Sequence, residues 1–351
     1  MHKSFLGAVS AGLLLLIVMV ACSTGTPPPA AIDAAQLQAF QPSPDVMAST
    51  SNPITEEKVA LGRMLYYEPR LSKSQEISCN SCHMLDKYGV DSQPTSDGHK
   101  GKTGDRNSPT VYNAAGHMAQ FWDGRAANVE EQAKGPVMNP IEMAMDTEEE
   151  VLVVLKSMPE YVALFKAAFP GEKDPVTYDN MARAIGAFER KLTTPSRWDK
   201  LLAGDQNALT AEEKAGFRAY YEAGCQTCHA GAYVGGGSYQ RLGMVEAWPD
   251  TSDPGREKVT KSDADRMVFK VPSLRNIDRT GPYYHNGKVA TLAEAVSTMA
   301  QYQLGKTLTD AQVQSIVTWL GTLTGDLPAG YIKEPVLPKS TAKTPKPDKG
   351  E

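Results

Sequence analysis

The sequence predicts a mostly α-helical protein built from two domains of the same general plan. Apolar residues recur at helical spacing in several segments, and no segment shows the sustained alternation that is typical of β-strands. The pattern Cys-x-x-Cys-His occurs twice, at residues 79–83 and again at 225–229. This pattern is the attachment signature of a c-type haem, since both thiols can add to one porphyrin while the histidine binds its iron. We therefore expect two cytochrome c-like domains, each with one covalently bound haem c.

A zinc half-site or a disulfide is the alternative interpretation of one such motif. Two copies that both end in histidine favour haem. Four of the five cysteines are then used for haem attachment, and none remains for a structural disulfide. The predicted thioether cysteines are Cys79, Cys82, Cys225 and Cys228, and the predicted proximal iron ligands are His83 and His229.

Length and charge narrow the class of protein. A chain of 351 residues can hold two domains with ordinary cores. The net charge is −5 and no basic stripe is present, so nucleic acid is not expected as a partner.

The first 22 residues predict a signal peptide that ends in a lipoprotein box. An apolar run at 13–20 precedes the small-residue sequence Val20-Ala21-Cys22. Lipid on Cys22 would hold the protein to a membrane. The alternative is an ordinary cleaved signal that leaves a spare thiol. Both interpretations predict the periplasm, because haem c is attached outside the cytoplasm.

The remaining chain divides by composition. Residues 23–52 are rich in Ser, Thr, Pro and Ala and predict a flexible linker. We expect an N-terminal haem domain at 53–192 and a C-terminal haem domain at 193–330, whose last helix could pack back on the first domain. Residues 331–351 are expected to be a disordered tail.

Helix starts can be placed by their capping residues. Thr55, Thr210, Thr291 and Thr309 each precede a helical apolar pattern and are expected N-caps. Residues 91–109 are polar, rich in Gly and without periodicity, and predict a long loop.

The second axial ligand of each iron decides function. His99 lies in the long loop, where a histidine is by default a solvated surface residue, but a ligand there could leave the iron. Met299 shares a helix face with Leu292 and Val296, 70 residues after His229. It is either an ordinary core methionine or an iron ligand that raises the reduction potential.

Three other side chains could contribute to chemistry. Glu142 lies in an apolar stretch broken by Pro140, where a carboxyl tends to have a raised pKa suited to proton transfer. A salt-bridging or helix-start glutamate is the alternative. Gln132 is a further candidate. Trp122 is either a core aromatic residue or a bridge between two porphyrins.

Taken together, these motifs resemble the bacterial di-haem cytochrome c peroxidases over about residues 53–328. Besides the two haem motifs, the resemblance is carried by residues 98–99, 106–110, 121–125, 132–133, 135–136, 142–143, 271–276 and 281–287.

The resemblance implies a role for each candidate. The N-terminal haem would be the low-potential peroxidatic one, with His99 as a displaceable ligand and Gln132 and Glu142 lining the peroxide pocket. The C-terminal haem would be high-potential, held by His229 and Met299, with Trp122 between the two haems. A calcium ion would be bound by Asn107 and by the carbonyls of Thr280 and Pro282.

The resemblance also implies an activity and partners. Hydrogen peroxide would be reduced to water with electrons from a small c-type cytochrome or a blue-copper protein, and a homodimer is expected. Two alternatives stay open: a non-catalytic di-haem electron carrier, and a related di-haem oxidase that acts on a protein or thiol. The relative that oxidises tryptophan on a methylamine dehydrogenase precursor has Tyr where Met299 stands, which argues against that activity.

Overall fold

The computed structural model describes residues 1–2 and 31–348. The chain divides into two compact units, residues 1–30 and 31–351, and the fold below is that of the second. Almost all of the predicted signal peptide, Cys22 included, lies outside the described residues, and so does the first part of the predicted linker. No helix in the described part of the chain is long and apolar enough to cross a membrane.

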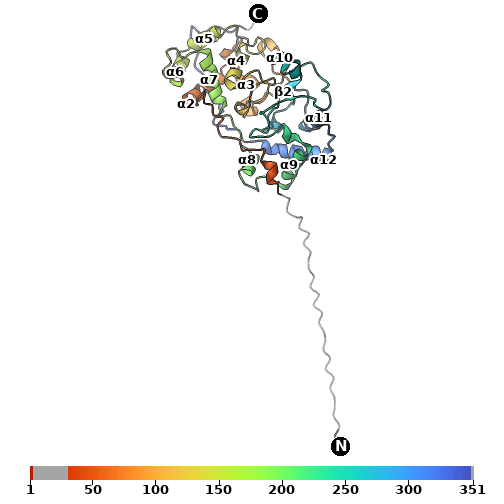
Figure 1. The fold of residues 1–351 in the computed structure, drawn as a ribbon. Helices are drawn as coiled ribbons and strands as arrows, with labels where there is room; N and C mark the ends of the chain where they lie inside the picture. The colour runs from red at the N-terminus through yellow and green to blue at the C-terminus, as the bar shows by residue number, and fades with distance from the viewer. Residues whose placement is uncertain (3–30, 349–351) are drawn as a thin grey trace. The chain divides into compact units, whose positions relative to one another are not determined.

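Helices dominate the second unit, which confirms the predicted fold class (Figure 1). The helices are α1 (Ala34–Leu37), α2 (Glu56–Tyr66), α3 (Cys79–Cys82), α4 (Val129–Met138), α5 (Glu148–Lys156), α6 (Pro159–Ala168), α7 (Tyr178–Glu189), α8 (Arg197–Leu202), α9 (Ala211–Ala223), α10 (Glu257–Thr260), α11 (Leu292–Leu304) and α12 (Asp310–Leu320). In the described residues the one sheet is an antiparallel pair, β1 (Tyr239–Arg241) and β2 (Val268–Lys270).

A first apolar core lies among α2, α4, α5, α6 and α7. Met181, Ile185 and Phe188 of α7 are fully buried in it, as their helical spacing predicts. α2 and α7 approach closely, because a Cβ on Gly62 would lie 1.9 Å from the carbonyl oxygen of Ala184. Glycine is required at this crossing.

A second core joins α8, α9 and α12 around aromatic rings. Trp198, Phe217 and Trp319 are fully buried, and their ring centroids lie 4.9–5.4 Å apart. A Cβ on Gly216 would lie 2.1 Å from the carbonyl oxygen of Ser315, so the α9–α12 crossing also requires a glycine.

The predicted N-caps open the expected helices. The side chains of Thr55, Thr210, Thr291 and Thr309 each accept a hydrogen bond from a backbone N–H in the first turn of α2, α9, α11 and α12. Each bond satisfies a backbone donor that the helix itself cannot pair.

The linker prediction is wrong for residues 31–52. Ile32, Phe40 and Met47 are buried, and the Phe40 ring packs edge-on against Trp198 at 5.5 Å. Three apolar residues this far apart produce no periodicity, so the polar composition between them hides their role. Ile32 and Phe40 are therefore part of the second core, while the backbone of Met47 is hydrogen-bonded to Arg190.

The tail prediction is also wrong for residues 331–348. The Tyr331 ring stacks on Phe188 at 5.0 Å, and Arg70 donates to the carbonyl of Pro338 at 2.8 Å. Backbone carbonyls, the Tyr331 ring and the buried Ile332 hold this segment on the first core, and so few apolar residues produce no periodic pattern in the sequence.

The last helix, α12, does not pack back on the first domain as predicted. α12 packs on α9 in the second core, and the residues that reach the first core come after it, at Leu327, Tyr331 and Ile332. The first core includes Leu192 and the second includes Trp198, but the domain limits at 192 and 193 stay a prediction.

Candidate functional site: two haem cavities

The first Cys-x-x-Cys-His motif opens onto a cavity in the N-terminal half. Cys79 and Cys82 form the ends of α3, and His83 follows directly as its C-cap. All three line the cavity, together with Gln132 from α4 and Glu142 from the turn after it. The structure thus brings together five of the predicted site residues.

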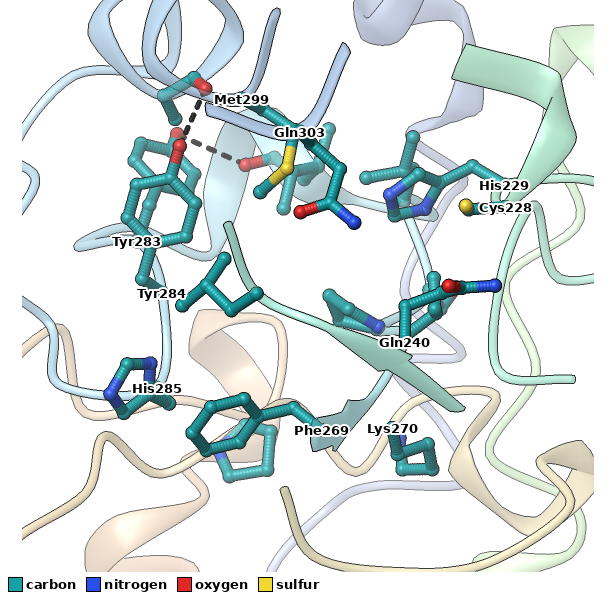
Figure 2. A pocket seen from close by; sticks show the side chains of 18 of the residues that line it. Cys228, His229, Gln240, Phe269, Lys270, Tyr283, Tyr284, His285, Met299 and Gln303 are labelled. Carbon is teal, nitrogen blue, oxygen red and sulfur yellow. Dashed lines mark hydrogen bonds between the residues drawn. The ribbon is translucent and has the colours of Figure 1, made fainter. Parts of the chain in front are cut away.

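The second motif opens onto another cavity in the C-terminal half (Figure 2). Gly224 ends α9 with a φ of 95°, which lets the chain turn sharply into Cys225. Cys225, Cys228 and His229 line this cavity, and so does Met299 from α11. Figure 2 shows Met299 and His229 projecting into the cavity from different elements.

A tyrosine anchors each motif from the helix that precedes it. Tyr66 of α2 donates from its hydroxyl to the carbonyl of His83 at 2.8 Å, and Tyr220 of α9 donates to the carbonyl of His229. Both rings are almost fully buried. Sequence reasoning missed this pair, because the spacing from tyrosine to histidine differs between the two halves.

The motif side chains fit haem c. Burial lowers the pKa of His83, and that of His229 to about 4, so both rings are neutral at pH 7 and can bind a metal. The four motif cysteines are unpaired thiols, and burial raises the pKa of Cys82 and Cys225 to about 11. Each cavity therefore has two thiols for attachment and one imidazole for the iron.

Glu142 has the environment that the sequence predicts. Burial raises its pKa, while the charge of Arg125 and a hydrogen bond from Asn139 oppose the shift. Asn139 Nδ2 donates to Glu142 Oε1 at 2.9 Å, which holds the carboxyl in one orientation. Gln132 lines the same cavity, so an acid–base group and an amide face one space.

His99 is not among the side chains that line the N-terminal cavity, although Gly98 is. Its backbone N–H donates to the carbonyls of Ile141 and Glu142, and its Nδ1 is buried without a partner in the described residues. Burial lowers its pKa. The structure therefore does not bring the His99 ring together with His83.

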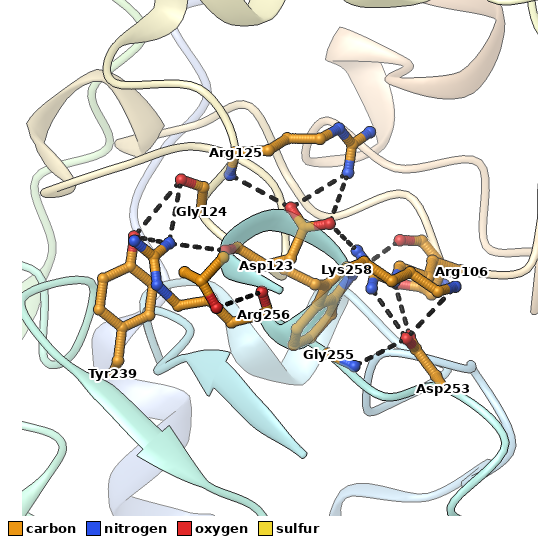
Figure 3. A network of polar contacts seen from close by, with 12 residues as sticks. Arg106, Asp123, Gly124, Arg125, Tyr239, Asp253, Gly255, Arg256 and Lys258 are labelled. Carbon is orange, nitrogen blue, oxygen red and sulfur yellow. Dashed lines mark hydrogen bonds and ion pairs between the residues drawn. The ribbon is translucent and has the colours of Figure 1, made fainter. Parts of the chain in front are cut away.

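Trp122 lies between the two cavities. It lines both of them, and its Nε1 donates to the carbonyl of Asn107, which also lines both. Arg106 holds this region in place through ion pairs to Asp123 at 2.6 Å and to Asp253 at 2.6 and 2.8 Å (Figure 3). Spacing alone could not indicate the Arg106–Asp253 pair, because the partners are far apart in the chain.

The three predicted calcium ligands line the same cavity. Asn107, Thr280 and Pro282 all line the C-terminal cavity. The Asn107 side-chain nitrogen donates to the carbonyl of Gln93 at 2.9 Å, which leaves Oδ1 as its other polar atom. The described residues contain no group of three or more His, Cys, Asp or Glu arranged for a metal.

Two cavities of this kind in one helical chain define the class: the protein is a di-haem c-type cytochrome. The family model described as "Di-haem cytochrome c peroxidase" matches residues 56–207. The cytochrome c551 peroxidase of Pseudomonas aeruginosa is 46% identical over 315 residues, covering 88% of this chain and 90% of that protein. The methylamine utilization protein MauG of Methylorubrum extorquens is 35% identical over 82% of this chain and 81% of its own length.

Solved structures agree with the sequence comparisons. A MauG-like protein associated with microbial copper homeostasis superimposes with a TM-score of 0.75 at 27% identity, over 83% of this chain and 97% of that one. The chain therefore belongs to the di-haem cytochrome c peroxidase family.

Proposed function

We propose that this protein reduces hydrogen peroxide to two waters, with two protons and two electrons taken one at a time from a small redox protein. The observation that carries the proposal is Glu142, a buried carboxyl of raised pKa that shares a cavity with Gln132 and the haem histidine His83. An electron carrier whose irons always keep both axial ligands has no use for an acid–base group beside the iron.

The two haem sites would have different roles. Haem, when bound, supplies iron that accepts single electrons from the donor, and the two haem sites together would supply the two electrons that peroxide requires. His83 would hold one iron, and His229 with Met299 the other. A thioether ligand raises the reduction potential, so the C-terminal site would store an electron. Trp122 lines both cavities and would lie on the path between the two haems.

Glu142 would move the proton. It would accept a proton from the near oxygen of peroxide and deliver one to the far oxygen, so that water leaves. Asn139 would keep the carboxyl aimed at the substrate through its hydrogen bond. Proton transfer by a positioned group is typically worth about 10²–10⁴ in rate.

His99 would act as a removable ligand of the N-terminal iron. Its ring is not among the side chains that line the N-terminal cavity. The His99 ring would leave that ligand position when the protein is partly reduced, which makes room for peroxide beside Gln132 and Glu142. The next residue, Lys100, has a left-handed backbone conformation with a φ of 59°. This conformation interrupts regular helix geometry in the short segment that carries His99.

Calcium would bind beside the C-terminal cavity. Asn107 Oδ1 and the carbonyls of Thr280 and Pro282 are hard oxygen donors of the kind calcium prefers. Because Asn107 also accepts the Trp122 hydrogen bond, the ion would steady the residue between the haems.

Location and partners are proposed from the sequence. Haem c attachment and the signal-like first 22 residues favour the periplasm, with a lipid on Cys22 as the anchor. The donor would be a small c-type cytochrome or a blue-copper protein, and the acidic net charge of −5 would suit a basic one. A homodimer is the expected assembly.

The related oxidase activity on a protein or thiol is the second candidate, supported by the similarity to MauG proteins. Met299 in the C-terminal cavity argues for the peroxidase. The deciding experiment mixes the haem-loaded protein with peroxide and a pre-reduced small cytochrome c. Oxidation of two equivalents of donor for each peroxide consumed supports the proposal. A protein that exchanges electrons with the donor but consumes no peroxide would contradict it.

A further inference from the structure

Lys270 is a buried cation with no partner in the chain. It ends β2 and is 8% exposed. Its ammonium nitrogen makes no hydrogen bond or ion pair with any described residue. Burial lowers the pKa of Lys270 to about 8, and no neighbouring carboxylate opposes the shift.

The other buried lysine and arginine side chains in the described residues are all paired. Lys58 donates to Asn52 Oδ1 and to the carbonyl of Pro53. Arg190 forms an ion pair with Glu130, and Arg275 forms one with Asp199. An unpaired buried charge is costly, and such groups normally have a counter-ion. Among the buried cations of the described residues, Lys270 thus differs in having no partner from the chain.

The space next to Lys270 is the C-terminal haem cavity. Lys270 lines this cavity, where Figure 2 shows it beside Phe269 and below Gln240. No aspartate or glutamate is among the described residues that line it, whereas Arg241 is a second cation on its wall. The charge of Lys270 also contributes to the lowered pKa of His117 on the same wall. The cavity has an excess of positive charge.

The N-terminal cavity, unlike the C-terminal one, has acidic side chains on its lining. Glu142 and Glu189 both line it, and burial raises the pKa of Glu189 to about 8. The N-terminal cavity therefore has acids as well as Arg106 and Arg125 on its lining, whereas the described lining of the C-terminal cavity has cations and no acid.

We propose that Lys270 binds a propionate carboxylate of the C-terminal haem and that its charge raises the reduction potential of that haem. A haem carries two propionates, and these are the carboxylates that the cavity otherwise lacks. A nearby cation stabilises the reduced iron, which has one positive charge fewer than the oxidised iron. This inference deepens the proposed function and rests on its assignment of the C-terminal haem as the electron store.

The test is a spectroelectrochemical titration of the haem-loaded protein, without donor or peroxide. Lys270→Met should lower the potential of the C-terminal haem, so that the equilibrium constant for its reduction falls about tenfold or more. Lys270→Arg keeps the charge and should stay near the wild type. Lys200→Met removes an exposed charge in α8 and is the matched control.

Two results would overturn the proposal. One is an unchanged C-terminal potential in Lys270→Met. The other is a Lys270→Arg potential that falls as far as that of Lys270→Met, which would indicate packing rather than charge.

A crystal structure of the haem-loaded wild type decides the matter independently of the variants, even if Lys270→Met fails to take up haem. The lysine nitrogen should lie within hydrogen-bond distance of a propionate oxygen. A lysine that faces solvent or a protein carboxylate would contradict the inference. Neither measurement depends on turnover, so an absence of peroxidase activity would be a separate result.

Discussion

The indole Nε1 of Trp122 donates a hydrogen bond to the carbonyl of Asn107 at 2.9 Å, and both residues line both haem cavities. The hydrogen bond therefore fixes the indole ring of Trp122 between the two haem cavities. The same asparagine is the proposed side-chain ligand of calcium. Electron transfer and ion binding would thus depend on one short segment, which Arg106 fixes to Asp123 and Asp253.

Trp122→Phe should slow electron transfer between the haems several-fold while both haems are retained. The variant keeps an aromatic ring but loses the hydrogen bond that orients it. Rapid mixing of the half-reduced protein with peroxide, followed at the C-terminal haem, measures the rate. Trp248→Phe is the control, because Trp248 is buried against Tyr284 and Tyr302 and lines neither cavity. Equal rates in the two variants would remove Trp122 from the path.

His99→Gly should produce a high-spin N-terminal haem in the oxidised protein and activity without prior reduction. The reason is that the removable ligand is gone. Absorption spectra and turnover of the fully oxidised protein check both effects. Lys100→Gly alters the same turn and should behave like the wild type, since Lys100 already has a φ of 59°. If the wild-type oxidised protein is itself high-spin and fully active, the gate does not exist.

Met299→His should lower the potential of the C-terminal haem and abolish most turnover with the donor, because imidazole favours the oxidised iron more than a thioether does. Redox titration reports the potential. Met244→His, at a methionine that is 56% exposed, should leave the potential where it is. An unchanged potential in Met299→His would mean that another group binds the iron.

The pH dependence of peroxide turnover should reflect Glu142. Turnover needs the carboxylate form, so the rate should fall as pH drops through the raised pKa of this group. The charge of Arg125 lowers that pKa. Arg125→Gln should therefore raise it, and the acidic limb of the pH–rate profile should move to higher pH. Lys134→Gln removes a half-buried cation of α4 that pairs with Glu131 and Asp179 and does not line the cavity, so it should not move the limb. A shift to lower pH in Arg125→Gln would contradict the role of Glu142.

The sequence could predict much of this arrangement because its signals are local. The two haem motifs have a fixed spacing, and each threonine cap lies beside the helix that it opens. The stripe on α7 predicts a buried face, and that face is buried. These features need only the neighbouring residues to be recognised.

Features that depend on distant partners could not be predicted. The Phe40 segment and the Tyr331 segment have a polar composition, and each packs through a few contacts with a surface formed elsewhere. Lys270 looks like any strand lysine until the structure shows that it is buried and unpaired. The backbone of His99 is likewise held by hydrogen bonds to the carbonyls of Ile141 and Glu142, which have no sequence signal.

The most direct test of the proposed peroxidase mechanism is the rate at which half-reduced Glu142→Gln is oxidised by peroxide after rapid mixing. The variant keeps the size and the hydrogen bonding of Glu142 but cannot transfer a proton, so haem content and donor reduction should survive. Glu131→Gln, at an exposed acid on α4, is the control. We predict that haem oxidation in Glu142→Gln slows by about 10²-fold or more, the lower end for a lost acid–base group. Haem oxidation at the wild-type rate would contradict the mechanism and make Glu142 a structural residue.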